Sequence, residues 1–298
     1  MNILITGAWN CTREEMAWFS DMGHRVVFLQ REQDPLPVSC EWVEGVICNG
    51  LFLHHPVEKF TNLRFVQLTS AGLDRVPVEY LREKGIALYN ARGVYSIPMA
   101  EFAVCGVLQL YKQSRFFEEN RKNRTWQKHR GLLELAGKTV CILGCGSVGT
   151  ECAKRFGAFG CRVIGVDPVP RQDSMYAYIY PPESLDDRLS EADILILALP
   201  LTTESRGLID SQRLNRMKKG AVLVNIARGP VVENQALIRW LREERGAAVL
   251  DVFEEEPLPQ DSPLWELENV ILTPHNSFVG EGNSRRLFAL IKKNLGTV

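Results

Sequence analysis

The sequence lacks the features that mark a membrane protein or an exported one. Its most apolar stretch, residues 94–111, is interrupted by Pro98 and Glu101, so no run reaches the length of a membrane helix. The first residues, MNILITG, have no basic leader and turn polar within a few positions, which is not typical of a signal peptide. We therefore expect a cytoplasmic protein.

The sequence also lacks a charge excess and paired cysteines. Its formal net charge is −1, so there is no electrostatic reason to expect a nucleic-acid or membrane partner. All eight cysteines lie at or before Cys161 and none form a C-x-x-C pair, so we expect buried free thiols and no metal site. Hydrophobic residues make up 45% and charged residues 24%, values that are ordinary for folded soluble proteins. Small molecules are therefore the expected ligands.

One stretch, residues 138–167, carries a specific binding pattern. Residues 139–143 form an apolar run, which predicts a strand buried on both faces, and they lead into Gly144-Cys145-Gly146-Ser147-Val148-Gly149. This is G-x-G-x-x-G, in which the glycines allow a tight turn, a close approach of backbone to a pyrophosphate, and close packing of the next helix. The phosphates would lie at the N-terminus of a helix predicted over residues 147–159.

The acid that follows this helix predicts which dinucleotide binds. A second strand, residues 162–166, ends at Asp167, which lies 167 − 149 = 18 residues past the last glycine. A carboxylate at about that distance hydrogen-bonds the adenosine ribose and repels the 2′-phosphate of NADP. We therefore expect NAD as the cofactor, although Arg171, four residues further on, leaves NADP open.

The rest of the chain alternates strand-like and helix-like runs, which predicts an α/β fold with parallel sheets, and 298 residues favour two domains. In the first part, strands are expected over residues 3–6, 25–29, 45–48, 64–68 and 86–89, and helices over 12–22 and 78–84. After a long helix over 97–118, six strands are expected over 139–143, 162–166, 193–199, 221–226, 247–252 and 270–273. Six strands joined by helices match a doubly wound sheet, in which ligands bind at the carboxyl ends of the strands.

The segment of residues 120–134 is basic and contains Trp126 and His129. It is either a solvated connection or an exposed arm with an aromatic anchor, and the aromatic favours a subunit contact.

The positions just after the later strands hold an arginine, a group of acids and a histidine. Here the chain resembles the D-isomer-specific 2-hydroxyacid dehydrogenase family. The resemblance covers nearly the whole chain and rests on motifs in family order: LTSAGLDRVP (68–77), NARGVYSIPMAEF (90–102), GCGSVG, LPLTTESRGLI (199–209), NIARGPVV (225–232), DVFEEEPLP (251–259) and LTPH (272–275). It implies two Rossmann-like or flavodoxin-like domains with doubly wound parallel sheets and a cleft between them. Residues 1–93 plus 276–298 would form the substrate domain, and residues 94–275 the NAD-binding domain.

The resemblance also implies roles for individual residues. Arg228 would hold the substrate carboxylate and carbonyl oxygen, His275 would be the general acid/base, and Glu256 would orient it; the backbone at Ala71 and Gly72 would complete the carboxylate site. The implied cofactor contacts are Gly144, Gly146, Ser147, Val148, Gly149, Asp167, Leu199, Pro200, Ile226, Ala227, Arg228, Asp251 and His275. The residues alone leave other roles open, since an arginine can cap a strand end and three consecutive acids are often only solvated.

The resemblance thus implies an NAD-dependent enzyme, expected as a homodimer, that interconverts a small D-2-hydroxy acid and its 2-oxo acid. NADP-dependent reduction of glyoxylate or hydroxypyruvate and a non-catalytic NAD(H)-sensing role are the alternatives. The chain departs from the family pattern at Arg92, where proline is common, at Ser147, where arginine is frequent, and at Asn276-Ser277-Phe278, where small apolar residues and glycine are usual. These departures leave the substrate open.

Overall fold

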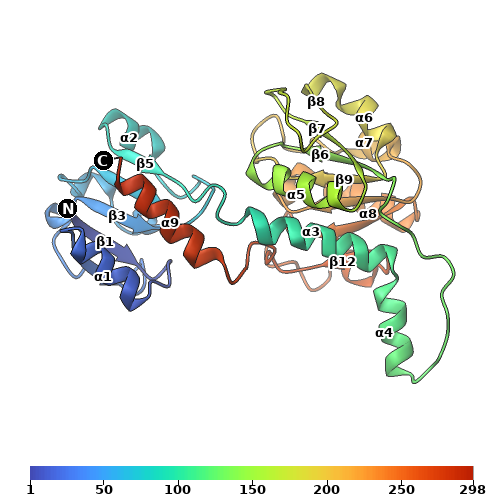
Figure 1. Cartoon of the computed structure of the whole chain (residues 1–298), viewed down its shortest axis with the longest axis horizontal. Coiled ribbons are helices and arrows are strands. Elements are labelled where there is room, and N and C mark those ends of the chain that lie inside the picture. The colour runs from blue at the N-terminus through green and yellow to red at the C-terminus, as the bar shows by residue number, and fades with distance from the viewer. Residues whose placement is uncertain (298) are drawn as a thin grey trace. The chain divides into compact units, whose positions relative to one another are not determined.

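The chain folds into two compact units, seen in a computed structural model that describes residues 1–297 (Figure 1). Unit 1 contains Met1–Tyr95 together with the described residues from Gly280 onward, and unit 2 contains Ser96–Val279. Each unit is built on a parallel sheet with helices on its faces, which confirms the predicted α/β class. The assignment of a substrate role to one unit and a nucleotide role to the other stays a prediction.

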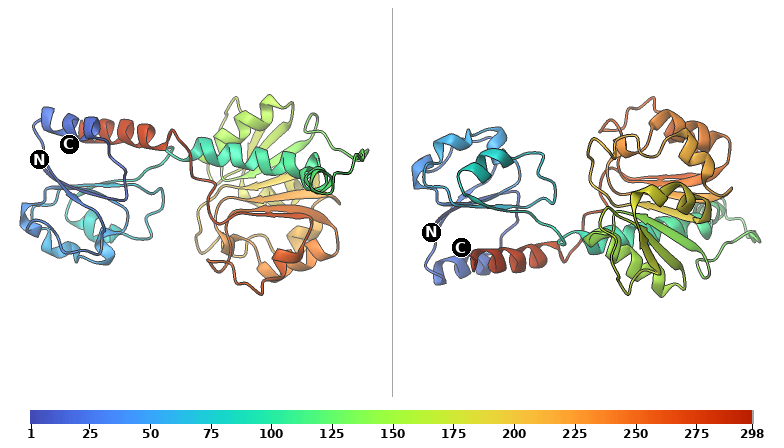
Figure 2. Two further views of the ribbon diagram at one scale, coloured as in Figure 1. Left: turned by 90° about the horizontal axis from the view of Figure 1, so that it is seen from below. Right: turned by 90° about the horizontal axis from the view of Figure 1, so that it is seen from above.

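Unit 1 holds a five-stranded sheet of order β2-β1-β3-β4-β5, with every neighbouring pair parallel. Its strands are β1 Asn2–Thr6, β2 Arg25–Leu29, β3 Gly45–Cys48, β4 Phe65–Leu68 and β5 Ala87–Tyr89, so all five predicted strands are confirmed. The helices are α1 Arg13–Asp21, α2 Val78–Glu83 and α9 Asn283–Leu295. Figure 2 shows α1 and α9 on one face of this sheet and α2 on the other.

The period-two alternation of β1 explains this arrangement. Ile3 and Ile5 pack in a cluster that includes Leu287 and Ile291 of α9, whereas Leu4 packs in the cluster of the opposite face. The start of α1 is fixed by a capping box in which Thr12 Oγ1 accepts from the Glu15 N–H and Glu15 accepts from the Thr12 N–H.

Unit 2 holds a seven-stranded parallel sheet of order β12-β11-β10-β9-β6-β7-β8. Its strands are β6 Thr139–Leu143, β7 Arg162–Val166, β8 Tyr178–Tyr180, β9 Ile194–Leu197, β10 Ala221–Asn225, β11 Gly246–Leu250 and β12 Val270–Leu272. The six predicted strands are present, but the prediction of six was wrong because β8 was missed. β8 is three residues long, too short to show a pattern, and it is recognisable only by its pairing with β7.

The helices of unit 2 cover both faces of this sheet, as Figure 2 shows. They are α3 Ser96–Tyr111 and α5 Ser147–Ala158 on one face, and α6 Leu185–Glu191, α7 Ser211–Arg216 and α8 Asn234–Arg242 on the other. Short 3₁₀ helices occupy Cys40–Trp42, Leu51–Leu53, Val57–Lys59, Pro182–Ser184, Gly229–Val231 and Pro263–Glu266. Strands are added to the sheet in opposite directions from the β6/β9 pair. The carboxyl ends of β6 and β9 therefore form a topological switch point.

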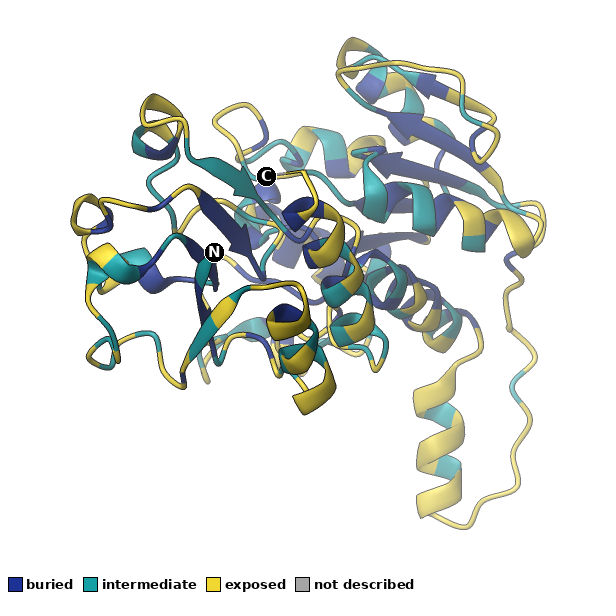
Figure 3. Cartoon of the chain, turned by 60° about the vertical axis from the view of Figure 1, so that its left-hand side comes forward, coloured by how far each residue is buried: buried dark blue, intermediate teal, exposed yellow. Residues whose placement is uncertain are grey.

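The predicted single helix over 97–118 was wrong, because the chain forms α3 and then a separate α4, Ser114–Lys122. Gln113 adopts a left-handed conformation with φ of 52°, which ends the first helix. The break falls where the apolar sequence ends: α3 packs onto the sheet, whereas α4 has no buried residue. Figure 3 shows α4 and the segment after it almost entirely exposed.

All eight cysteines are free, but the prediction that they are buried holds only in part. Cys48, Cys141, Cys145 and Cys152 are buried, whereas Cys105 is exposed and the other three are intermediate. Burial raises the pKa of the Cys141, Cys145 and Cys152 thiols to about 12, so these three stay protonated at neutral pH. Within residues 1–297, no helix is long and apolar enough to cross a membrane.

Candidate active site

The glycine turn after β6 has the close packing that a dinucleotide cradle needs. Gly144 has φ of 90°, and a Cβ atom there would lie 2.8 Å from the backbone of Ala198, at the end of β9. A Cβ on Gly149 would lie 2.1 Å from the Gly144 carbonyl oxygen, so the helix α5 packs directly against the turn. Both positions therefore require glycine, and the turn lies at the switch point of the sheet.

The first turn of α5 has the donors that phosphates require. Gly146 is the N-cap of α5 and no side chain caps the helix, so the first backbone N–H groups keep their donor capacity. Such a helix end is a ready anion site, and it needs no side chain from Ser147. The residues present therefore fit a dinucleotide.

The acid and the arginine that bear on cofactor choice both contact this turn. Asp167 accepts hydrogen bonds from the Cys145 N–H at 2.8 Å and the Val169 N–H at 2.9 Å. Arg171 donates to the Cys145 carbonyl oxygen and lies 3.8 Å from Asp173. A negative and a positive group thus stand together where β7 ends.

His275 and Glu256 form a hydrogen-bonded pair. His275 Nδ1 lies 2.8 Å from Glu256 Oε2, while Glu256 Oε1 accepts from the Phe253 N–H at 3.0 Å. Since the carboxylate is an acceptor, the bond assigns the Nδ1 proton to the ring. Within the described residues Nε2 has no hydrogen-bond partner and the side chain is 41% exposed. Nε2 is therefore the nitrogen available to exchange a proton with a bound molecule.

Asp251 holds the loop that carries His275. Its buried carboxylate accepts from Thr273 Oγ1 at 2.7 Å, the Asn276 N–H at 2.7 Å and the Ser277 N–H at 2.9 Å. Its carbonyl oxygen accepts from the His275 N–H at 2.8 Å. The family motif predicts Asp251 only as a cofactor contact; its hold on this loop cannot be predicted, because the sequence does not show which backbone groups a carboxylate meets.

Arg228 follows β10 in a loop shaped by its neighbours. Asn225 Nδ2 donates to the Arg228 carbonyl oxygen at 3.1 Å, and Asn225 Oδ1 accepts from the Ala227 N–H at 3.1 Å. The Arg228 guanidinium donates through Nη1 to the Ala227 carbonyl oxygen at 2.7 Å and keeps other N–H groups for a ligand. Arg228 thus lies at the same edge of the sheet as the loops of Glu256 and His275, since β10, β11 and β12 are parallel neighbours.

Gly229 brings two of these loops together, a feature that the sequence does not show. A Cβ atom at Gly229 would lie 1.9 Å from the Phe253 carbonyl carbon and 2.4 Å from the Glu254 nitrogen. The loop of Arg228 therefore packs backbone to backbone on the loop that leads to Glu256. Of the other predicted contacts, Ile226 and Ala227 are buried beside Arg228, and Leu199 and Pro200 follow β9.

In unit 1, Ala71 and Gly72 follow β4 in a loop whose carbonyl groups are already bonded. Asn90 Nδ2 donates to the Ala71 oxygen at 2.7 Å, and Ser70 Oγ donates to the Gly72 oxygen at 3.1 Å. The N–H groups of Ala71 and Gly72 have no partner among residues 1–297. They are therefore two adjacent donors of the kind that bind a carboxylate.

Known proteins are similar to this chain in sequence and in architecture. A family model described as "D-isomer specific 2-hydroxyacid dehydrogenase, NAD binding domain" matches residues 104–277. A D-3-phosphoglycerate dehydrogenase of Methanocaldococcus jannaschii is 36% identical over 222 residues, which are 74% of this chain but 42% of that protein. A glyoxylate/hydroxypyruvate reductase A of Arabidopsis thaliana is 38% identical over 232 residues, 76% of this chain and 71% of that protein.

Solved structures match over nearly the full length. A D-isomer specific 2-hydroxyacid dehydrogenase family protein from Aeromonas salmonicida has a TM-score of 0.83 and 29% identity, and covers 99% of this chain and 94% of its own. A D-isomer specific 2-hydroxyacid dehydrogenase from Xanthobacter autotrophicus, solved with NADPH and MES, has a TM-score of 0.79 and 26% identity, and covers 99% and 93%.

Proposed function

Because the chain belongs to the D-isomer-specific 2-hydroxyacid dehydrogenase family, a family of oxidoreductases, we propose that it interconverts a small D-2-hydroxy acid and its 2-oxo acid with NAD. The chain spans less than half of the phosphoglycerate dehydrogenase that it matches, so the activity is inferred from its own residues as well. The single observation that carries the proposal is the 2.8 Å pair of His275 and Glu256, at the strand end of a sheet that also bears a dinucleotide turn.

The proposed cofactor contacts follow the sheet edge. The first turn of α5 would hold the pyrophosphate and Asp167 the adenosine ribose, with Leu199, Pro200, Ile226, Ala227 and Asp251 toward the nicotinamide half. When bound, nicotinamide supplies hydride to the substrate C2 carbon in reduction and accepts it in oxidation.

Arg228 is the proposed substrate anchor. Its guanidinium has N–H groups beyond the one bonded to Ala227, and their planar fork suits a carboxylate and the adjacent carbonyl oxygen. The free N–H groups of Ala71 and Gly72 are proposed as further carboxylate donors. Polarisation of the carbonyl by Arg228 stabilises the negative charge that develops on its oxygen.

His275 is the proposed general acid and base. In reduction, Nε2 gives a proton to the forming alkoxide, and in oxidation it takes the proton from the hydroxyl group. The Glu256 carboxylate accepts from Nδ1–H and so orients the ring with Nε2 free.

NAD is proposed over NADP because Asp167 presents negative charge at the end of β7. The alternative, an NADPH-dependent glyoxylate or hydroxypyruvate reductase, draws on Arg171 beside the same turn and on relatives with those names. A panel of 2-oxo acids with NADH and NADPH, followed by cofactor absorbance, tests both. NADH binding without turnover of any 2-oxo acid would instead mean a sensor.

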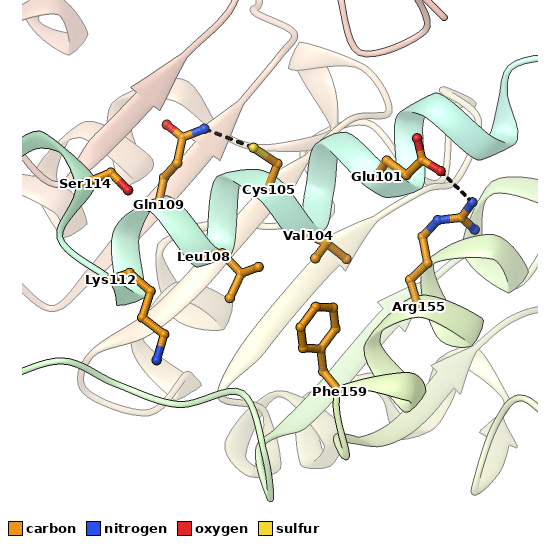
Figure 4. A pocket seen from close by; sticks show the side chains of 9 residues that line it. All are labelled: Glu101, Val104, Cys105, Leu108, Gln109, Lys112, Ser114, Arg155 and Phe159. Carbon is orange, nitrogen blue, oxygen red and sulfur yellow. Dashed lines mark hydrogen bonds and ion pairs between the residues drawn. The ribbon is translucent and has the colours of Figure 1, made fainter. Parts of the chain in front are cut away.

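A homodimer formed through residues 100–135 is also proposed. Trp126 is 97% exposed on the segment after α4, which suits an interface anchor. A hollow of about 510 Å³ runs along α3, with Val104, Leu108 and Phe159 inside and a Glu101–Arg155 ion pair of 3.0 Å at one end (Figure 4). None of the proposed catalytic or cofactor residues lines it, so its apolar lining fits a protein contact better than the chemistry. A cytoplasmic location stays a prediction.

A further inference from the structure

Glu32 joins the ends of three strands in unit 1. It lies three residues after β2, and its carboxylate accepts from Thr6 Oγ1 at 2.8 Å, the Asn49 N–H at 2.7 Å and the Gly50 N–H at 2.7 Å. Thr6 ends β1 and is fully buried, and Asn49 directly follows β3. One carboxylate therefore binds at the carboxyl ends of β1 and β3, the switch point of a sheet of this strand order.

Glu32 also holds the far end of the segment that follows β3. The His55 Nε2 atom lies 2.9 Å from the Glu32 carbonyl oxygen, which can only accept, so the ring donates this bond. Residues 49–55 are thus fixed at both ends by one residue. Between these ends the chain forms a single 3₁₀ turn, Leu51–Leu53, whose backbone bonds are all short-range, to the carbonyl oxygens of Gly50 and Leu51.

The conformation of residues 49–55 carries an energetic cost of its own. The Asn49 Oδ1 atom is buried and has no hydrogen-bond partner among the described residues. An unsatisfied buried acceptor disfavours the conformation that contains it. The charge-assisted bonds from the neighbouring N–H groups to Glu32 are strong ones and offset that cost.

The clamped segment lies against the loop proposed to bind the substrate carboxylate. The Thr69 N–H donates to the Cys48 carbonyl oxygen at 2.8 Å, which ties the start of that loop to the end of β3. A Cβ atom at Gly50 would lie 3.6 Å from Cδ of Arg75, which follows Ala71 and Gly72 in the same loop, so the two loops lie side by side. A shift of residues 49–53 would therefore move the surroundings of the Ala71 and Gly72 donors.

We propose that Glu32 is a positioning residue for substrate selection, because it fixes residues 49–55 beside the carboxylate-binding loop. This inference rests on the proposed function. It requires that Glu32 act on substrate binding and on the choice between 2-oxo acids, and not on proton transfer, since the His275–Glu256 pair lies in the other unit.

The test compares Glu32→Gln with a matched variant, Glu44→Gln. Glu44 likewise accepts a backbone N–H, that of Asn2 at 2.7 Å, and it lies at the opposite end of the same sheet, 3.1 Å from Arg64. In Glu32→Gln the side chain has one acceptor oxygen in place of two, so one donor of the segment loses its partner. Glyoxylate, pyruvate and 4-methyl-2-oxopentanoate are assayed with NADH for each protein, together with melting temperature and NADH affinity.

For Glu32→Gln we expect KM for the preferred 2-oxo acid to rise about tenfold, with kcat within about threefold and NADH affinity unchanged. The ratio of kcat/KM between pyruvate and glyoxylate should change at least about fivefold. Such a change is within reach, because one carbon in a well-formed pocket changes kcat/KM by about 10–200-fold. Glu44→Gln should lower the melting temperature without changing either quantity. If Glu32→Gln does not fold, His55→Ala, which frees only the far end of the segment, should shift KM and the ratio in the same direction by less.

Two failures are distinguishable. An active unmodified protein whose Glu32→Gln or His55→Ala variant behaves like Glu44→Gln would overturn the role of Glu32 and leave the proposed function in place. An unmodified protein that binds NADH and reduces none of the three acids would overturn the proposed function, and this role with it.

Discussion

The Nδ1 atom of His275 lies 2.8 Å from Oε2 of Glu256, although the two residues are 19 positions apart in sequence. The second oxygen of that carboxylate is held by the Phe253 N–H, so the acid cannot rotate freely. His275 itself has φ of 50°, a conformation that costs a non-glycine residue on the order of 1–3 kcal/mol. The hydrogen bonds from this loop to Asp251 offset that cost, and they keep the ring in one orientation with Nε2 available.

The first prediction is that His275→Asn loses proton transfer but keeps cofactor binding. Asparagine is polar and of similar size but cannot exchange a proton at neutral pH, so kcat should fall about 10²–10⁴-fold. NADH affinity, measured by fluorescence titration, should change little. The control is His24→Asn, a histidine of unit 1 that contacts the N-terminal amine. Turnover by His275→Asn close to that of the control would remove His275 from the mechanism.

The second prediction concerns the orienting role of Glu256. Glu256→Gln keeps an acceptor for the Nδ1–H of His275, but its amide nitrogen replaces the oxygen that accepts from the Phe253 N–H, so the side chain loses one of its two bonds. We expect kcat to fall at least about tenfold because the ring is less well oriented, while NADH affinity changes little. The measurement is kcat with one 2-oxo acid, together with an NADH titration. If kcat equals that of the unmodified enzyme, Glu256 is not the orienting partner, and Glu254→Gln and Glu255→Gln become the variants to test.

Sequence patterns predicted the parts of this fold that depend on local regularity. Buried strands such as β9 and β10 appear as apolar runs, and the acids and the histidine could be placed because they directly follow such runs. Features that depend on tertiary contact could not be predicted. β8 is a strand only because it pairs with β7, and the close approach of Gly229 to Phe253 exists only once two loops meet.

The break between α3 and α4 shows the same limit. Nothing in the residues around Gln113 prohibits a helix, and the turn occurs where packing onto the sheet ends. The three hydrogen bonds that Glu32 accepts likewise come from β1 and from the segment after β3, which are distant from it in sequence. A site residue can therefore be predicted from its strand end, whereas the residues that position it need the structure.

The third prediction tests the contact at Gly229. A Cβ atom in Gly229→Ala would meet the Phe253 backbone, which cannot move aside as a flexible side chain can, so the Arg228 and Glu256 loops should separate. A misplacement of about 1 Å can cost about 10²-fold in rate, and we expect kcat/KM to fall by about that factor. The control is Gly157→Ala on α5, where an added Cβ atom would meet nothing within 4 Å beyond its own helix backbone, and where alanine favours the helix. Equal activity of the two variants would contradict the prediction.

The fourth prediction concerns cofactor choice. Asp167→Ala removes the charge that repels a 2′-phosphate and leaves Arg171 beside the turn, so the preference of kcat/KM for NADH over NADPH should shrink at least about tenfold. Some activity with NADH should also be lost, because Asp167 accepts the Cys145 N–H. Adding Arg171→Ala should remove the gain with NADPH. Asp187→Ala, on an exposed face of α6, should leave the preference unchanged. An unmodified protein that uses NADPH as well as NADH would refute this role of Asp167.

The last prediction concerns assembly. Trp126 is 97% exposed and makes no contribution to the core, so Trp126→Ser should leave the melting temperature of the folded chain almost unchanged. A buried interface tryptophan is often worth about 2 kcal/mol or more in association, which is enough to move a dimer of moderate affinity toward monomer at micromolar concentration. Light scattering should therefore report a dimer for the unmodified protein and for the control Trp265→Ser, and mainly monomer for Trp126→Ser. Trp265 suits the control because it is 56% exposed and lies in the 3₁₀ helix Pro263–Glu266, where its indole N–H donates to the Pro259 carbonyl oxygen. A monomeric unmodified protein would exclude the proposed assembly. A stable dimer of Trp126→Ser would instead place the contact elsewhere, and the apolar hollow along α3 would be the next surface to alter.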